Sequence, residues 1–433
     1  MDVMIVSLIG IGLLFLLLLS GLEIAVVLGG IGCLGFIFLV DQPLIHATRI
    51  WWEVTNSFIL TAVPLFIFMG ALFVHSGATR SLFDGVNKWL GFLPGGLACS
   101  VVGSCALFAA ISGSSLATVA TIGTISLPEM RKQKYAAKLA LGTIAAGGTL
   151  GILIPPSITM IIYGEWVGVS IIRLFAAGII PGIILAMLFS VGIMAVARLF
   201  PRLAPKPGKS TWTEKLRSTK GLAPWVATMF VVLGGIFAGI MTPTEAAAVG
   251  VVCSLVISTA YRQLSFKVLK RALADTVKLT SMILFLVVGA KVLAFVILSL
   301  GIGKHVSIAM LGFAGGSKYA ILAIIYLMYL MLGCFLEPLG MMVVTLPFII
   351  PVIHGLGLSS VWFGIPLVIM CEAGFITPPV GLNLFILKGL NPEYGIGEIA
   401  IGAAPFLIPM LMVVWLVTIW PQFALWLPGI MMG

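Results

Sequence analysis

Charged side chains are scarce in this sequence, and that scarcity decides its class. Asp, Glu, Lys and Arg make up 9% of the 433 residues, whereas hydrophobic residues make up 61%. About a quarter of the residues in an ordinary soluble domain are charged. Apolar runs of roughly 20 residues, each long enough to cross a bilayer, recur along the whole chain. Because no stretch is polar enough for a soluble catalytic domain, the sequence predicts an all-α polytopic protein embedded in a lipid bilayer.

Motifs for metal, nucleotide and catalytic sites are missing as well. None of the six cysteines belongs to a CxxC pair and the four histidines lie far apart, so no zinc site is predicted. The GKST segment at 208–211 is not a nucleotide-binding loop, because Leu203 stands where that motif requires a glycine. No Ser/His/Asp arrangement accompanies the apolar segments. We therefore expect neither an enzyme nor an organic cofactor, and any transport must draw on ion gradients.

The net charge of +10 follows from basic residues that cluster between the apolar runs. Segments 92–128 and 319–353 are too long for one span and have polar or proline-bearing centres, so we interpret them as re-entrant hairpins. If both segments are re-entrant, nineteen Lys and Arg residues fall in cytoplasmic loops and three fall in outer loops. This asymmetry fits the positive-inside rule, so the positive charge does not indicate nucleic-acid binding. Both termini are then outside. Spans are predicted at 3–19, 22–40, 57–76, 139–168, 171–197, 222–242, 244–261, 280–300, 361–388 and 398–420.

The N-terminal apolar run has no basic residue before it, and the first Lys or Arg of the chain is Arg49. A cleaved signal peptide would begin with a basic region. We therefore interpret residues 3–19 as a retained span.

A proline pair occurs twice, in GILIPPS at 151–157 and GFITPPV at 374–380, shifted by 223 residues. A polar hairpin centre precedes each pair, SGSS at 112–115 and EPLG at 337–340. The chain therefore contains two copies of span, hairpin, broken span and span, which the topology makes inverted repeats. Repeat 1 is predicted at 57–197 and repeat 2 at 280–420, with N-terminal scaffold helices at 1–56, a cytoplasmic loop and scaffold helices at 198–279 and an outer tail at 421–433.

Proline removes a backbone donor and breaks a helix. Interrupted spans in matching positions of two halves are typical of the binding site of a secondary transporter, where freed carbonyls coordinate Na⁺ and helix N-termini face anionic groups. Prolines that only kink helices are the alternative. Hard cations prefer oxygen ligands. Neutral oxygens near the two breaks come from Ser112, Ser114, Ser115, Ser157, Thr159, Thr377 and Asn383.

These motifs resemble the large membrane subunit of tripartite ATP-independent periplasmic (TRAP) transporters. The resemblance extends over nearly the whole chain and rests on four segments: SGSSLATVATIGTISLPEM at 112–130, GTLGILIPPSITMIIYG at 148–164, TLPFIIPVIHGLGL at 345–358 and GFITPPVGLNLF at 374–385. It implies Na⁺-coupled uptake by an elevator mechanism, in which hairpins and broken helices slide against a scaffold. It also implies a small membrane subunit, a periplasmic binding protein that delivers a carboxylate, and a bacterial inner membrane with both termini in the periplasm.

The resemblance also implies site residues. Relatives often carry Asp where this chain has Glu337, and the longer side chain could contact either an ion or the substrate. The expected Na⁺ ligands are Ser112, Gly113, Ser114, Ser115, Gly147 and Pro155 in a first site, and Glu337, Gly340, Gly374, Thr377 and Pro379 in a second. The expected substrate contacts, between the two hairpin tips, are Ser114, Ser157, Glu337 and Asn383.

Ionisable residues at membrane depth are candidates for function by default. Glu337 is the favoured functional carboxylate, whereas Glu372 either has a function or stabilises a helix end. Lys291 either pairs with a glutamate or attracts the substrate carboxylate. Glu245 caps a helix start, and Arg173 snorkels to an interface.

Two other functions fit the same sequence. A stand-alone Na⁺/carboxylate symporter would not require a binding protein. A membrane scaffold or passive pore would show no ion-specific binding at the hairpin tips.

Overall fold

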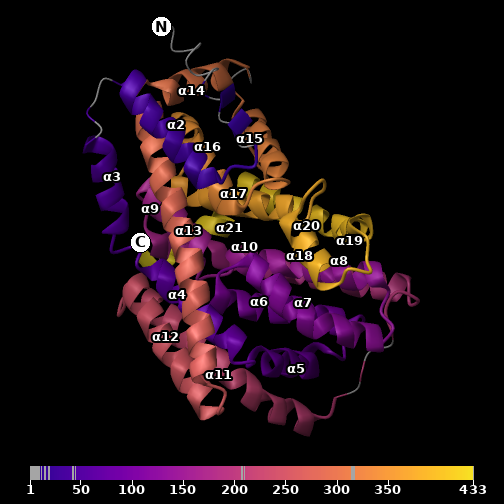
Figure 1. Cartoon of the computed structure of the whole chain (residues 1–433). Helices are drawn as coiled ribbons and strands as arrows, with labels where there is room; N and C mark the ends of the chain where they lie inside the picture. The colour runs from indigo at the N-terminus through magenta and orange to yellow at the C-terminus, as the bar shows by residue number, and fades with distance from the viewer. Residues whose placement is uncertain are drawn as a thin grey trace.

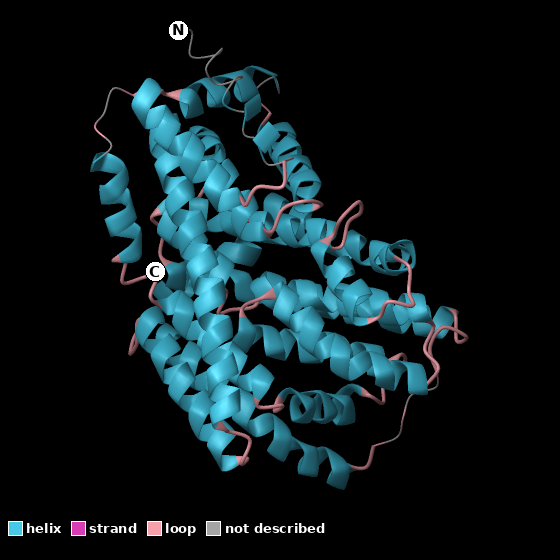
Figure 2. Cartoon of the chain, viewed as in Figure 1, coloured by secondary structure: helices cyan, strands magenta, loops and turns pink. Residues whose placement is uncertain are grey.

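The computed structural model describes residues 10, 12, 13, 16, 17, 20–40, 43, 45–205, 208, 210–313 and 317–432. Most of the predicted first span, 3–19, and the last residue of the predicted tail lie outside these ranges. All regular secondary structure in the described part is helical (Figure 2). The predicted all-α membrane fold is therefore confirmed.

The first half of the chain runs through two scaffold helices, a bent helix pair, a hairpin and a broken helix. α5 turns away from α4 by 78°. The bounds are α2 (Ile24–Phe38), α3 (Ile45–Thr55), α4 (Ala62–His75), α5 (Thr79–Leu90), α6 (Gly96–Ser112), α7 (Ser115–Lys132), α8 (Ala137–Gly148), the 3-10 turn η1 (Thr149–Ile152), α9 (Ile158–Val167) and α10 (Ile171–Leu199).

The second half follows the same order of elements after two connecting helices. The bounds are α11 (Trp212–Phe237), α12 (Pro243–Ala260), α13 (Phe266–Ser299), α14 (Ile302–Phe313), α15 (Lys318–Gly333), α16 (Pro338–Gly355), α17 (Ser360–Phe375), α18 (Leu382–Leu390), α19 (Ile396–Ala403), the 3-10 turn η2 (Ala404–Phe406), α20 (Leu407–Ile419) and α21 (Gln422–Met432). The predicted break at each proline pair is present, between η1 and α9 and between α17 and α18. That the two halves are inverted in the membrane stays a prediction.

α11, α12 and α13 form one layer with the shorter α2 and α4, and the hairpins and broken helices lie beside it (Figure 1). α10 is also long but packs against α6 and α17. We call α2, α4, α11, α12 and α13 the long-helix layer, and α6–α9 with α15–α18 the hairpin body. α13 packs along α2 and α4, and α4 packs along α12. In the hairpin body, α6 packs on α7 and α8, and α15 packs on α17.

Glycines set the closest helix crossing in the long-helix layer. A Cβ added to Gly289 of α13 would lie 2.6 Å from the carbonyl oxygen of Ala25, and one added to Gly32 of α2 would lie 2.8 Å from the Leu293 nitrogen. Small residues let membrane helices approach this closely. The α2–α13 pair is thereby fixed as a single unit.

Several predicted loops are helical. α3 lies in the predicted connection before residue 57, α5 and α14 lie in predicted loops, α13 begins at Phe266 rather than near 280, and α21 lies in the predicted tail. These segments were predicted as loops because their mean hydropathy is low or their apolar run is short. α5 is an example, because it buries Leu82, Phe83 and Val86 on one face and carries polar residues on the other, which lowers its mean hydropathy.

Six described helices are long and apolar enough to cross a membrane, or up to seven if the bent pair α4–α5 is one span. Three predicted spans, 22–40, 139–168 and 361–388, contain apolar helices too short for that test, α2, α8 and α17. α16 passes the test although it was predicted as one arm of a hairpin. Length alone therefore does not separate hairpin arms from spans in this chain.

Candidate functional site

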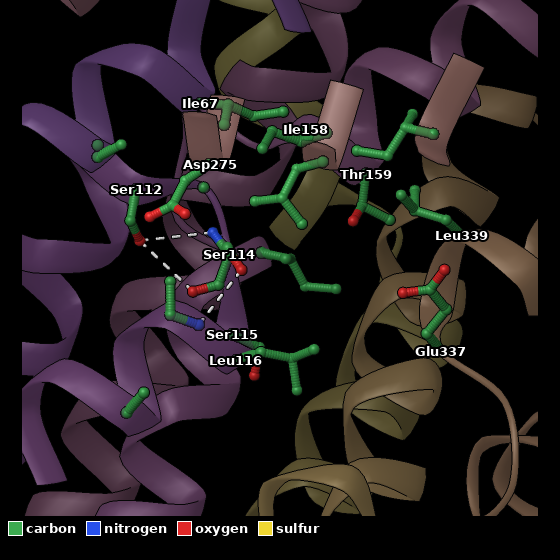
Figure 3. A pocket seen from close by; sticks show the side chains of 18 of the residues that line it. Ile67, Ser112, Ser114, Ser115, Leu116, Ile158, Thr159, Asp275, Glu337 and Leu339 are labelled. Atoms are coloured by element: carbon green, nitrogen blue, oxygen red, sulfur yellow. Dashed lines mark hydrogen bonds between the residues drawn. The ribbon is translucent and has the colours of Figure 1, made fainter. Parts of the chain in front are cut away.

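A cavity of about 470 Å³ lies where the two hairpin tips meet the long-helix layer (Figure 3). Ser112 to Ser115 line one side and Glu337 lies across from them. Asp275 and Lys278, from the polar half of α13, also line it. The other polar lining residues are His75, Thr121, Thr159 and Glu372.

The first hairpin tip is a tight turn held by its own hydroxyls. Gly113 has a φ of 58°, a left-handed conformation that favours glycine. Ser114 caps α7 by accepting a hydrogen bond from the Ala117 N–H at 3.4 Å. Thr118 donates to the Ser114 carbonyl at 2.7 Å, and its Oγ1 lies 3.2 Å from the Ser112 Oγ. The shape of the tip is therefore set by its own hydrogen bonds.

This tip touches the first helix break, as the sequence predicted for a shared site. A Cβ added to Gly151 would lie 2.8 Å from the Ser114 carbonyl oxygen, and one added to Gly113 would lie 3.0 Å from the Pro156 carbonyl oxygen. Gly147 is less close to the tip, because it packs against Cys105 in α6. Pro155 is not among the residues that line the cavity.

Ser157 takes a structural position. It caps α9 by accepting from the Met160 N–H at 3.3 Å, and it is fully buried. It does not line the cavity, whereas its neighbour Thr159 does. A direct contact between Ser157 and substrate thus stays a prediction without a geometric counterpart here.

The second tip and the second break also touch. A Cβ added to Gly374 would lie 2.4 Å from the Gly333 Cα, and the Gly381 N–H donates to the Cys334 carbonyl at 3.1 Å. The Thr377 hydroxyl donates to the Ala373 carbonyl at 2.7 Å.

Other residues of the predicted second Na⁺ set are spread out. Gly340 faces Ile24 of α2, and Pro379 is exposed. Glu337 stands at the N-cap of α16, where its side chain makes no capping hydrogen bond, and it lines the cavity. Its carboxylate is therefore available to a ligand.

A buried polar chain joins the two halves of the hairpin body. Asn383 Nδ2 donates to the Ser115 Oγ and to the Ala145 carbonyl, both at 3.2 Å. Ser115 Oγ in turn donates to Glu372 Oε2 at 2.8 Å. Asn383 is fully buried and does not line the cavity, so its hydrogen bonds hold Ser115 in place and its predicted substrate contact stays a prediction.

Glu372 is the residue whose role the sequence left open. Its side chain is 1% exposed, and Oε1 has no hydrogen-bond partner among the described residues. It forms no ion pair with a described Lys, Arg or His. A buried carboxylate without a partner is costly, so this oxygen is suited to a proton or a bound cation. The sequence could not pair Glu372 with Ser115, because 257 residues separate them.

Lys291 forms an ion pair with a glutamate, which confirms one of its two predicted roles. Its Nζ lies 3.7 Å from Glu165 Oε1, and the Ser57 hydroxyl donates to the same oxygen at 3.2 Å. Glu165 belongs to α9 of the hairpin body, whereas Lys291 lies in α13. The contact therefore ties the hairpin body to the long-helix layer.

Two other contacts of charged residues lie outside the hairpin tips. Glu245 forms a capping box with Thr242, as predicted for a helix start. His75 Nε2 lies 2.6 Å from Asp275 Oδ2 and so joins the end of α4 to α13 beside the cavity. The sequence did not single out this pair, because the two residues are 200 positions apart.

A model of the family described as "Tripartite ATP-independent periplasmic transporter, DctM component" matches residues 11–423. The chain belongs to this family. TRAP large permeases are membrane transporters and not enzymes, so the chain is a membrane-embedded transporter subunit of a bacterial family. Membership in the family implies a small membrane subunit and a periplasmic binding protein.

Named relatives extend over nearly the whole chain. The C4-dicarboxylate TRAP transporter large permease DctM of Rhodobacter capsulatus is 35% identical and covers 97% of this chain and 98% of its own length. The sialic acid TRAP transporter large permease SiaM of Vibrio cholerae is 31% identical over 87% of this chain and 88% of its own length. The crystal structure of the YdaH transporter from Alcanivorax borkumensis has a TM-score of 0.58 at 14% identity, covering 92% of this chain and 97% of that one, which supports the fold alone.

Proposed function

We propose that this TRAP large permease takes up a carboxylate, delivered by a periplasmic binding protein, by coupling it to Na⁺ in an elevator mechanism. The observation that carries the proposal is the pairing of each hairpin tip with a helix break around one cavity. Relatives whose printed names include C4-dicarboxylate and sialic acid support a carboxylate substrate. The isethionate transporter DctMQ of Oleidesulfovibrio alaskensis, of which this chain covers 66%, supports pairing with a small membrane subunit.

Na⁺ is favoured by the oxygen-rich surroundings of the tips. Hydroxyl and carbonyl oxygens of Ser112, Ser114 and Thr118 converge at the first tip. The free carboxylate oxygens of Glu337 and Glu372 lie along the same cavity. Hard cations are bound by such oxygens, and a cation would also offset the cost of burying Glu372.

A carboxylate would enter a cavity that already contains acids, so the order of binding follows from charge. Na⁺ bound at the tips would neutralise Glu337 and Glu372 before the anion approaches. The N-termini of α7 and α9, aimed at this region with their serine caps, then favour negative charge. This order links ion binding to substrate binding without a basic side chain at the tips.

The elevator part of the proposal rests on the division into two bodies. The cavity reaches Asp275 and Lys278 in the polar half of α13, which the positive-inside rule places toward the cytoplasm. We infer that this arrangement is inward-open. In the outward-open arrangement the hairpin body would slide along α13, and the Glu165–Lys291 contact would separate.

Ion gradients suffice for this transport. If two Na⁺ accompany one monovalent carboxylate, one net charge crosses the membrane, worth ~2.3 kcal/mol at about 100 mV. A roughly tenfold Na⁺ gradient adds ~1.4 kcal/mol per ion. The sum of about 5 kcal/mol supports accumulation of roughly several thousandfold.

Uptake into proteoliposomes tests the proposal. The chain is reconstituted with its small subunit and binding protein, and uptake of a C4-dicarboxylate and of a sialic acid is compared in Na⁺ and K⁺ gradients. Uptake should require Na⁺, and Ser115→Ala should reduce it at least about tenfold. Ser254→Ala on α12 is the matched control, because its buried hydroxyl bonds only to its own helix.

Three results would each contradict part of the proposal. Equal uptake in Na⁺ and K⁺ gradients would refute Na⁺ coupling, and electroneutral uptake would refute the stoichiometry. Full uptake without the binding protein would favour a stand-alone Na⁺/carboxylate symporter.

A further inference from the structure

A second cavity, of about 530 Å³, lies between α8, α10, α19 and α20. Its lining includes Leu188, Val191 and Gly192 of α10. Ile408 and Met412 of α20 also line it. The cavity shares no lining residue with the one at the hairpin tips, and its volume is within the usual range of a ligand pocket. We call it the α10 groove, and it is a separate candidate for a bound molecule.

The α10 groove opens between segments that are suited to a membrane. α10 and the segment Ile396–Ile419, which includes α20, are both long and apolar enough to cross a bilayer. Among the described residues that line the groove, only Lys138 is charged. Val191 is 54% exposed and Met412 is 56% exposed, so the protein itself does not cover the groove. Because apolar surface between two spans meets lipid, an acyl chain is the occupant that this lining favours.

Basic side chains gather at the end of the groove where α8 begins. The Ala136 N–H donates to the Leu203 carbonyl at 2.9 Å, which joins the start of α8 to the turn after α10. Lys138 and Leu203 line the groove, and Arg202 precedes Leu203 in that turn. Arg198 lies in the last turn of α10. We call Lys138, Arg198 and Arg202 the basic rim.

The charge of the basic rim is not offset within the described part of the chain. Its three residues are exposed, and none of them forms an ion pair with a described residue. Glu398 of α19, the helix that packs against α8, does not line the groove. The positive-inside rule places both loops that carry the rim on the cytoplasmic side. Anionic lipids of the cytoplasmic leaflet attract Lys and Arg at that surface.

We propose that the α10 groove binds an anionic phospholipid of the cytoplasmic leaflet, with an acyl chain along the groove and the phosphate at the basic rim. Lys and Arg bind phosphate oxygens through charge-assisted hydrogen bonds, and Arg can do so with two donors at once. A zwitterionic lipid would bring its own ammonium group next to three positive side chains, which weakens its binding. The inference goes beyond the proposed transport function, because the groove shares no residue with the hairpin tips.

Lipid titration tests this site. The chain is purified with its small membrane subunit, stripped of lipid in detergent, and titrated with phosphatidylglycerol or with phosphatidylcholine. Thermal unfolding measures the stabilisation by lipid that binds the folded state, and native mass spectrometry counts the bound lipids. We expect phosphatidylglycerol to stabilise the chain at an about tenfold lower concentration than phosphatidylcholine.

Two variants separate the groove from its rim. A Cβ added to the exposed Gly192 would meet no atom within 4 Å, so a tryptophan there has room to turn into the groove. Gly192→Trp should therefore weaken phosphatidylglycerol binding about tenfold or more. Lys138→Gln combined with Arg202→Gln should remove the preference for phosphatidylglycerol, because the phosphate then has lost two of its three cations.

Each variant has a matched control. Gly234→Trp on α11 matches the first, because Gly234 is also exposed with no atom within 4 Å of an added Cβ. Lys267→Gln combined with Arg271→Gln, an exposed pair on α13, matches the second in charge. Both controls should bind phosphatidylglycerol as the wild type does.

Four results would overturn the inference. The first is equal stabilisation by the two lipids, and the second is wild-type phosphatidylglycerol binding in both test variants. The third is weaker binding of both lipids to Gly192→Trp with an unchanged preference in the rim variant, which would show that the groove holds any acyl chain regardless of its headgroup. The fourth is loss of the small subunit from Gly192→Trp with unchanged lipid binding, which would assign the groove to that subunit.

Discussion

The two hairpin tips have the same place in their halves of the chain but different chemistry. At the first tip, Ser114 caps α7 and Thr118 bonds to the Ser114 carbonyl. At the second tip, Glu337 occupies the corresponding cap of α16 without making a capping hydrogen bond, and Pro338 begins the helix. Hydroxyls thus stabilise the first turn, whereas the second carboxylate makes no capping hydrogen bond and stays free.

This difference separates a neutral site from a charged one. Cation affinity rises with the number of charged ligands, so an ion at the second tip would depend on one carboxylate. An ion at the first tip would depend on several neutral oxygens, each of which contributes less binding free energy than a carboxylate.

Glycine-to-alanine changes at the two tip–break contacts should have the largest effect. At Gly374 the new methyl would lie 2.4 Å from the Gly333 Cα, and at Gly151 it would lie 2.8 Å from the Ser114 carbonyl oxygen. We expect Gly374→Ala to lower the free energy of unfolding by about 3 kcal/mol and Gly151→Ala by about 2 kcal/mol. Thermal unfolding measures both, with Gly389→Ala, where no atom lies within 4 Å, as the control.

The Na⁺ dependence of stability should respond more to the carboxylate than to a hydroxyl. Glu337→Gln should raise the Na⁺ concentration for half-maximal stabilisation about tenfold or more, and Ser112→Ala about threefold. Thermal shifts in NaCl measure the two values, and KCl is the control. A larger effect for Ser112→Ala would reverse the proposed contrast between the tips.

The two halves also differ at the positions that the 223-residue shift relates, Glu165 and Lys388. Glu165 contacts Lys291 across the two bodies, whereas Lys388 donates to the carbonyls of Pro392 and Tyr394, both at 2.7 Å. The Glu165–Lys291 pair is partly exposed, so Lys291→Met should cost about 1 kcal/mol.

A double-mutant cycle with Glu165→Gln isolates that interaction. Lys267→Met, at the exposed start of α13, is the control. A coupling energy of zero between positions 165 and 291 would show that this contact does not hold the two bodies together.

Threonine-to-valine changes should have the smallest effects. Thr118 is buried and bonds to the hairpin tip at 2.7 Å, while Thr377 is half-buried and bonds back to its own helix at 2.7 Å. We expect Thr118→Val to cost about 1 kcal/mol and Thr377→Val about 0.5 kcal/mol in unfolding free energy. Equal costs would mean that the first tip is no more dependent on hydroxyls than the second.

Much of the architecture could be read from residue patterns. The proline pairs at 155–156 and 378–379 each remove two neighbouring backbone donors, so both breaks were predicted. The polar hairpin centres were visible because SGSS and EPLG interrupt apolar runs. α3 and α5 were missed, because a helix with a polar face lowers mean hydropathy as much as a loop does.

The individual site residues were harder to predict. Ser112 to Ser115 and Glu337 do line the cavity, but Asn383 and Ser157 are buried away from it. A sequence shows that an oxygen is available, not which way its side chain turns. For Asn383, the orientation depends on Ser115 and Ala145, which come from two other helices.

By itself, the sequence determined that this protein crosses a membrane and that two of its helices break. Those properties follow from composition and from proline chemistry, which act locally. Only the tertiary structure decided that Glu372 meets Ser115, that Glu165 meets Lys291 and that Arg49 lies on the exposed face of α3. Such contacts join residues on separate helices or depend on how a helix is turned, and packing sets both.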